Sequence, residues 1–338
     1  MTQPTRHAPL VLALGLAALA LVFLVLGMCI GSTGWQAWSD MTRDPVAWQI
    51  VWDIRLPRSA GAWGAGALLG LSGAVAQGLF RNPLADPYLL GSAAGASLGV
   101  CLALALLGVS PASLEWLAQI GLTGAAFVGA TGAVFLTLLL ARGVQHTLRL
   151  LLAGVVVGVV LGAASSLILL MQPQLLQAMQ GFLLGSTAFV GWGACLLMLA
   201  VWCLCTLLAW LFSPVLDGLA LGESTALSLG LPLAPMRLGL ILVLALASGT
   251  AVAQTGLIAF VGLAAPHLVR SLMRAAHAWL LLLSSLMGGV LLMAADLLAR
   301  ALIAPQELPV GVLTAVLGGG YLLWLMHRQS AALAGDAP

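Results

Sequence analysis

The sequence contains no lysine and few charged residues of any kind. Only 7% of its 338 residues are charged, whereas soluble domains carry roughly 25%. All 12 basic residues are arginines, and they are scattered along the chain, so a basic patch for nucleic acid is absent. These deficits exclude an ordinary soluble domain and predict that the chain does not bind nucleic acid.

Cysteine is also scarce. The five cysteines lie within apolar runs, which argues against a disulfide framework or a cysteine-based metal site. A phosphate-binding loop, a zinc-binding HExxH motif and a Ser/His/Asp spacing are likewise missing from the sequence. We therefore predict no catalytic residues, no bound metal and no cofactor, and any energy for a task must come from a partner chain.

Long apolar runs dominate what is present. The chain is 62% hydrophobic, with a mean hydropathy of +1.13, and a transmembrane helix needs about 20 apolar residues. We predict an all-α integral membrane protein that forms a single transmembrane domain over residues 1–338. Its ten helices are expected at residues 10–30, 60–80, 89–107, 117–141, 148–170, 192–212, 236–254, 257–271, 279–303 and 309–326. The eighth is short, which leaves a full crossing and a re-entrant segment both open.

The arginines predict the orientation of these helices. If the N-terminus is cytoplasmic, eight arginines fall in inner loops, and the four in outer loops are Arg43, Arg55, Arg58 and Arg300. The positive-inside bias then favours a cytoplasmic N-terminus and a cytoplasmic C-terminus.

A polar segment with two prolines, residues 78–91, separates the second and third predicted helices. It carries Arg81, Asn82 and Asp86 between two uncharged apolar runs. Irregular backbone is tolerated at a membrane only where protein covers it, where water reaches it, or where it lines a path. This pattern predicts machinery for passage rather than a simple anchor.

The sequence suggests two contact sites, a charged one on the outer side and an apolar one on the inner side. Arg55, Arg58 and Arg300 are expected to be exposed on the outer side, either as partners for carboxylates or as interfacial anchors; Asp296 can also pair with Arg300 at i,i+4 spacing. On the inner side, Leu219, Ala226 and Leu229 of segment 214–231 can form one apolar edge of a short helix. Such a helix suits a groove on another protein or the lipid interface.

Six segments together resemble the permease family of ATP-binding cassette importers for iron-siderophores, vitamin B12 and haem. They are RLPR at residues 55–58, SGAVAQGLFRNPLADPYLLGSAAGA at 72–96, LLLAG at 150–154, LDGLALGESTALSLGL at 216–231, GLIAFVGLAAPHLVR at 256–270 and ELPVGVLTAVLG at 307–318. Their order matches that of the family from the second helix to the tenth.

The resemblance implies a permease of the bacterial inner membrane that moves a metal chelate, most simply a ferric siderophore, from periplasm to cytoplasm. Cobalamin and haem are the other cargoes of the family. The implied partners are two cytoplasmic ATP-binding subunits, a periplasmic substrate-binding protein, a second permease protomer and membrane lipid. The competing hypothesis is a secondary transporter driven by an ion gradient, which would need midplane carboxylates.

The same resemblance assigns site residues. Arg55, Arg58 and Arg300 would receive the binding protein. Asn82, Leu84 and Thr147 would line a cytoplasmic gate, where His146 departs from the small hydroxyl residues of the family. Coupling to the ATP-binding subunits is assigned to Leu219, Gly222, Glu223, Ala226 and Leu229.

Overall fold

The computed structural model describes residues 7–31, 34–35, 44–107, 116–144 and 147–335. Ten helices correspond in order to the ten predicted spans: α1 (Ala8–Cys29), α4 (Leu56–Phe80), α5 (Ser92–Leu107), α6 (Trp116–Leu140), α7 (Thr147–Met171), α9 (Trp192–Ala220), α11 (Leu233–Thr255), α12 (Val261–Leu272), α13 (His277–Ala301) and α14 (Val310–Gly335). The shorter described elements are α3 (Pro45–Ile50), the π-helix η1 (Val51–Arg55), the 3-10 helix η2 (Pro87–Leu90), α8 (Leu175–Leu184), α10 (Glu223–Ser228) and the antiparallel pair β1 (Ile30–Gly31) and β2 (Gly34–Trp35).

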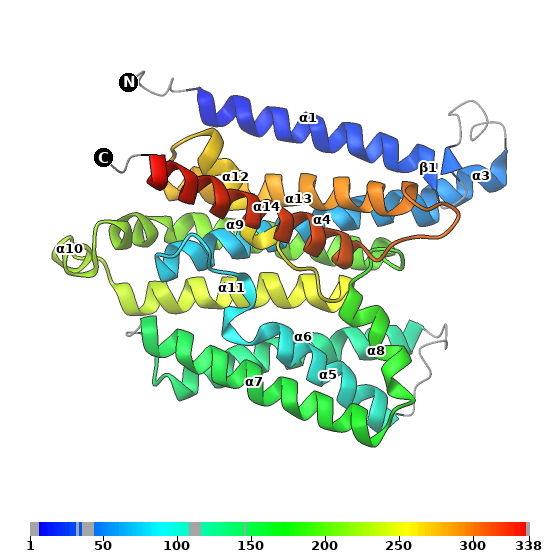
Figure 1. Ribbon diagram of the computed structural model, residues 1–338, viewed down its shortest axis with the longest axis horizontal. Helices are drawn as coiled ribbons and strands as arrows, with labels where there is room; N and C mark the ends of the chain where they lie inside the picture. Colours follow the sequence, from blue (N-terminus) through cyan, green and yellow to red (C-terminus); the bar gives the residue numbers. More distant parts are fainter. Residues whose placement is uncertain (1–6, 32–33, 36–43, 108–115, 145–146, 336–338) are drawn as a thin grey trace.

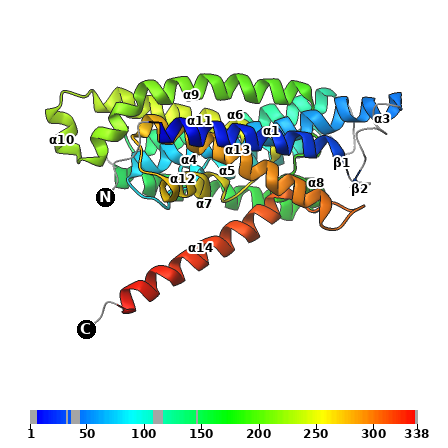
Figure 2. The ribbon, with the colours of Figure 1, turned by 90° about the horizontal axis from the view of Figure 1, so that it is seen from above.

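The all-α membrane architecture is confirmed. Seven of the described helical segments are long and apolar enough to cross a membrane, and the helices lie roughly side by side along one axis (Figure 1). Helix α14 diverges from the bundle along its length (Figure 2).

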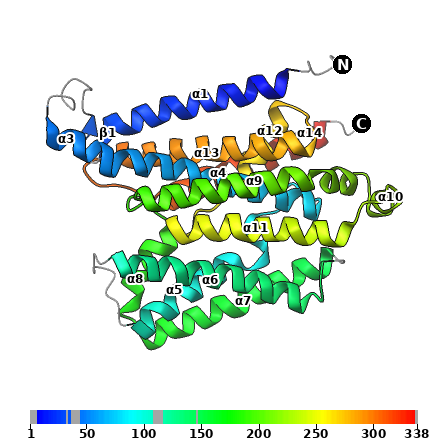
Figure 3. The same cartoon turned by 180° about the vertical axis from the view of Figure 1, so that it is seen from behind.

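The two ends of the bundle differ in character. One end, here named the cluster end, carries Arg58, Asp296 and Arg300, and α3 lies beside it. The other, the connector end, carries residues 81–91 between α4 and α5, and α10 (Figure 3). Helix α1 begins and α14 ends at the connector end. Both ends of the described chain therefore lie on one side, as an even number of crossings requires.

Helix α4 occupies the centre of the bundle. In its most apolar window 94% of residues are buried, against 11% for α1 and 17% for α7, although α1 and α7 are the more hydropathic helices. Alanine, glycine and serine supply most of the α4 sequence, so neighbouring helices approach it closely on every side. Leucine- and valine-rich helices lie at the periphery, where lipid tails solvate large apolar side chains.

Glycines make these approaches possible at defined points. A Cβ atom on Gly66 or Gly70 would collide with backbone carbonyls of α13, and one on Gly73 would collide with the carbonyl of Gly262 in α12. Gly95 and Gly99 make the same kind of contact with α6. The glycine faces of α4 and α5 are therefore packing surfaces.

Helix α7 also carries glycines four residues apart, Gly154, Gly158 and Gly162, but the face that they form is only partly packed. Gly154 meets the backbone of Leu89, whereas nothing lies within 4 Å of a Cβ built on Gly162. Gly91, four residues before Gly95, does not belong to α5 and ends η2 with a φ of 84°.

The eighth predicted helix crosses the bundle as a broken segment. Thr255 accepts a hydrogen bond from Ser186 N, and Gly311 N bonds Gly185 O, which places the end of α11 beside the start of α14 at the cluster end. His277, in contrast, lies at the connector end, where its N–H bonds Asp217. Residues 256–276 therefore span the bundle with only α12, of 12 residues, in helical form, and the re-entrant alternative is wrong.

We expect Gly70→Ala to destabilise the protein, because the new methyl group must displace the backbone of Ser284 on α13. Overpacking of this kind costs about 1–3 kcal/mol, and the apparent Tm in detergent should fall. Gly162→Ala is the matched control, since its Cβ meets open space and alanine favours helix over glycine. Equal Tm values for the two variants would contradict the proposed α4–α13 contact.

Candidate functional site

A buried ion cluster holds α4 and α13 together at the cluster end. The Nε and Nη2 atoms of Arg58 both donate to Oδ1 of Asp296, at 3.1 and 3.0 Å. Asp296 also forms the predicted i,i+4 pair with Arg300. Nη1 of Arg58 lies 2.8 Å from the carboxylate of Glu307. One carboxylate thus serves two guanidinium groups, and a second carboxylate at the rim neutralises part of the remaining charge.

Neutral groups complete the cluster and extend it to other elements. Thr187 donates its hydroxyl hydrogen to Asp296 at 2.5 Å. Arg300 donates to Ser59 Oγ at 3.2 Å and to Gly27 O at the end of α1 at 3.3 Å. Arg55 donates to Met28 O at 3.0 Å. Because backbone carbonyls at a helix C-terminus attract cations, the arginines fix α1 against α4 and α13.

The expectation that the three arginines are exposed is wrong. Arg55, Arg58 and Arg300 are only 7%, 8% and 1% exposed. The partners of Arg58 were not recognisable in the sequence, because Asp296 and Glu307 are distant from it along the chain. Only the Asp296/Arg300 spacing gave a local signal. Docking of a partner on these arginines stays a prediction, and any carboxylate that approaches them meets guanidinium groups that already have partners.

The connector between α4 and η2 presents two of the predicted gate residues to solvent. Asn82 and Leu84 are both exposed, Leu84 by 54%, and Asn82 Oδ1 accepts the Leu84 N–H at 2.9 Å. This local bond fixes the turn that carries Leu84 outward. Thr147 is the first residue of α7 and is half-buried. His146 lies outside the described residues.

Hydrogen bonds close the turn that continues this connector and attach it to distant segments. Thr137 donates to Leu90 O at 3.0 Å, and the Tyr88 hydroxyl donates to Ile258 O at 3.0 Å. Asp86 accepts the Tyr88 N–H at 2.8 Å and caps η2. Burial raises the pKa of the Asp86 carboxyl, and the Tyr88 N–H partly opposes that rise. The irregular backbone is thus covered by protein, one of the conditions under which a membrane tolerates it.

Helix α9 continues into the predicted coupling segment despite Pro214. A proline inside a helix leaves the carbonyl four residues earlier without its donor. Here that carbonyl belongs to Trp210, and Ser213 Oγ donates to it at 2.8 Å. The helix therefore extends to Ala220 instead of ending near residue 212.

The predicted apolar edge of the coupling segment does not form. Leu219 lies on α9, and both Leu219 and Ala226 are buried, at 1% and 0% exposure, whereas Leu229 is 62% exposed. Gly222, with a φ of 112°, turns the chain between α9 and α10 and folds Ala226 back against Gly218. The outward apolar surface of this segment consists instead of Leu221, Leu227 and Leu229.

An ion pair and two contacts between Asp217 and His277 attach the segment to the rest of the connector end. Glu223 on α10 pairs with Arg237 on α11 at 2.9 Å. Asp217 near the end of α9 accepts from the His277 N–H at 3.1 Å, and its Oδ1 lies 2.7 Å from His277 Nδ1. A force applied to α10 thus reaches α9 and α11 directly, and it reaches α13 through Asp217 of α9.

Comparison with known proteins gives one consistent result. Residues 18–328 match the model of the FecCD transport family. The hemin transport system permease protein HmuU of Yersinia pestis is 39% identical over 96% of this chain and 98% of its own length. The vitamin B12 import system permease protein BtuC of Pectobacterium atrosepticum is 38% identical over 92% and 93%. A solved structure of a metal-chelate type ABC transporter in an inward-facing conformation superposes with a TM-score of 0.83, at 31% identity over 94% and 98%.

We expect Asp296→Ala to destabilise the protein strongly, because it leaves Arg58 and Arg300 buried without their shared carboxylate. Removal of one member of a buried ion pair costs about 3–5 kcal/mol. Glu307→Gln is the control, since Glu307 is partly exposed and its loss costs at most about 1 kcal/mol. Thermal unfolding in detergent measures both variants. If Asp296→Ala unfolds no earlier than Glu307→Gln, the cluster does not hold the fold.

Proposed function

Since this chain belongs to the FecCD transport family, we propose that it is the membrane permease of an ATP-driven importer that carries a metal chelate into the cytoplasm. The match over residues 18–328 is the observation that carries the proposal. The distribution of charge agrees with it: in the ten described helices, charged residues lie within about two turns of a helix end. A proton or sodium relay through the spans would need ionisable groups between those ends.

The proposed cargo is a large metal chelate. Relatives that transport hemin and vitamin B12 are similarly close to this chain, and neither likeness favours the ferric siderophore expected from the sequence. The cargo can be identified in a strain that lacks the gene for this permease. Uptake of radiolabelled haem, cobalamin and a ferric siderophore is measured with and without the gene restored. Restoration for one of the three identifies the cargo class. Restoration for none, with the protein present in the membrane, contradicts the proposal.

The proposed orientation places the connector end in the cytoplasm of a bacterium and the cluster end in the periplasm. Two ATP-binding subunits would then meet α10 of this chain and α10 of a second permease protomer. Leu221, Leu227 and Leu229 would enter the ATP-binding subunits. Leu219, Gly222, Glu223 and Ala226 would hold α10 in position, because Leu219 and Ala226 are buried and Glu223 pairs with Arg237.

The proposed cytoplasmic gate uses Asn82, Leu84 and Thr147. Leu84 is an exposed apolar side chain on a turn fixed by Asn82. An exposed leucine at the connector end could close a path by packing against the same residue of a second protomer. Thr147 would contribute from the start of α7.

The proposed docking of a periplasmic binding protein on the cluster end involves an exchange of partners. Arg58 is bound to Asp296 inside the cluster and to Glu307 at its rim, where Glu307 is 25% exposed. A carboxylate on the binding protein could replace Glu307 without disturbing Asp296. Arg55 and Arg300 would contribute from inside the bundle, because backbone carbonyls of α1 bind both side chains.

We expect Leu227→Ser combined with Leu229→Ser to reduce co-purification of the ATP-binding subunit. The two leucines are 58% and 62% exposed, so their loss removes apolar contact area from a complex without emptying the permease core. Ser224→Ala, an exposed change on the same helix, should leave co-purification unchanged. Full recovery of the complex with the double variant would contradict the proposed contact.

We also expect Glu307→Gln to tighten the complex with the cognate binding protein. The change frees one side of the Arg58 guanidinium, and a pair at this exposure is worth about 0.2–1 kcal/mol, or up to roughly fivefold in Kd. Gln306→Ala, at the exposed neighbouring position, is the control. An unchanged or weaker affinity for Glu307→Gln would show that partner exchange at Arg58 does not occur.

A further inference from the structure

The helix that contains α4 is much longer than a membrane is thick. Pro45–Phe80 forms one continuous helical segment of 36 residues, which at about 1.5 Å per residue is roughly 54 Å long. The hydrocarbon core measures about 30 Å. The first part of this segment, α3 with η1, therefore extends through the headgroup layer at the cluster end.

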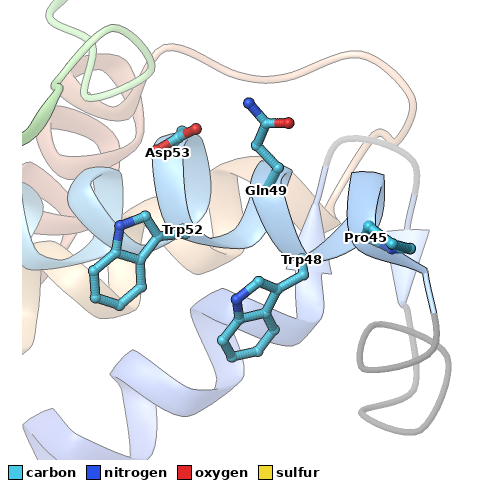
Figure 4. A pocket seen from close by; sticks show the side chains of 5 residues that line it. All are labelled: Pro45, Trp48, Gln49, Trp52 and Asp53. Carbon is cyan, nitrogen blue, oxygen red and sulfur yellow. The ribbon is translucent and has the colours of Figure 1, made fainter.

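This overhang has two dissimilar sides. The rings of Trp48 and Trp52 point to one side, whereas the side chains of Gln49 and Asp53 point to the other (Figure 4). The two tryptophans are 41% and 52% exposed. Together with Pro45, these four residues line an open surface hollow of about 410 Å³. An aromatic stripe beside a polar stripe is the pattern of a segment that lies at an interface.

The aromatic side continues into the exposed apolar surface of α9. Trp192, the first residue of α9, donates from Nε1 to Trp52 O at 2.9 Å, and the two rings lie 5.5 Å apart. From there α9 exposes large apolar side chains along its length: Leu196, Leu197, Leu204, Leu207, Trp210 and Leu211. The tryptophans thus extend an apolar face of α9 that the described part of this chain leaves exposed.

The spacing of the tryptophans fits the thickness of the headgroup layer. Four residues of helix place Trp48 about 6 Å farther along the axis than Trp52. The polar layer on each side of the hydrocarbon core is about 5–8 Å deep. With Trp52 and Trp192 at the hydrocarbon boundary, Trp48 lies among the headgroups, where tryptophan is enriched.

We propose that Trp48, Trp52 and Trp192 anchor the α3–η1 overhang in the lipid headgroup layer, with Gln49 and Asp53 facing water. The anchor orients the segment that leads directly into Arg55 and Arg58. Assignment to the outer leaflet rests on the proposed orientation of the importer, whereas contact with lipid does not.

Spin labels test the two sides of the overhang in the full-length protein. Cys203, the exposed cysteine among the five, is changed to serine, and a single cysteine is placed at position 48, 49, 52 or 53 and labelled. The protein is reconstituted in nanodiscs of phosphatidylethanolamine and phosphatidylglycerol. Collisions with oxygen, which enters lipid, and with a water-soluble nickel chelate are then measured.

Labels at 48 and 52 should favour oxygen, with 52 deeper by about 6 Å, and labels at 49 and 53 should favour the nickel chelate. Equal access of the chelate to all four labels would overturn the proposal. So would labels at 48 and 52 that lie in water and become shielded only when a binding protein is added, since the aromatic side would then be a protein interface.

A second measurement leaves the cysteines untouched. Tryptophan emission is quenched by lipids brominated near the headgroup, and Trp52→Phe should remove part of that quenching. Trp63→Phe is the control, because Trp63 packs against Trp202 and Gly289 inside the bundle. If Trp52→Phe and Trp63→Phe lose equal shares of the quenching, the anchor does not contact lipid.

Discussion

Close contact of α4 with its neighbours on every side is the constraint on which the rest of the structure depends. Lipid provides no hydrophobic force between apolar helices, so helices associate where their surfaces fit closely. In α4, Gly66, Gly70 and Gly73 bring its backbone against α12 and α13. The position of this one helix sets the positions of the arginines at one end and of the connector at the other.

Charge obeys a related constraint. A guanidinium group with little access to water is stable only with a carboxylate or several acceptors beside it. The cluster around Asp296 meets that condition and ties three helices together. At the connector end, Glu223/Arg237 joins the short outer helix α10 to α11, and Asp217/His277 joins α9 to α13. The ion pairs are therefore concentrated at the two ends of the bundle, which are the proposed contact surfaces for partner proteins. Between these ends, close packing of the helices stabilises the fold.

Much of the fold could be predicted from the sequence because long uncharged runs are direct signals of membrane helices. Ten helices in the observed order followed from that signal alone. The overhang at residues 45–55 was missed because Gln49, Asp53 and Arg55 interrupt the apolar pattern before α4. The extension of α9 was missed because Pro214 predicts a break, and the compensating hydrogen bond from Ser213 is visible only in three dimensions.

The candidate sites were less predictable, since exposure depends on partners far away in the sequence. Arg58 looked like a surface cation because Asp296 and Glu307 follow it by more than 230 residues. The spacing of Leu219, Ala226 and Leu229 predicts a shared edge, but with the turn at Gly222 the first two side chains are buried and Leu229 is exposed. Local spacing sufficed only for the Asp296/Arg300 pair, where both residues lie on one helix.

We propose that this chain supplies a path and its docking surfaces, while a partner supplies the energy. Uptake of chelate into vesicles that contain the permease, with the ATP-binding subunit and the binding protein added or omitted, tests it most directly. We predict accumulation only when both partners and ATP are present. Accumulation by the permease alone, driven by an ion gradient without nucleotide, would contradict the account.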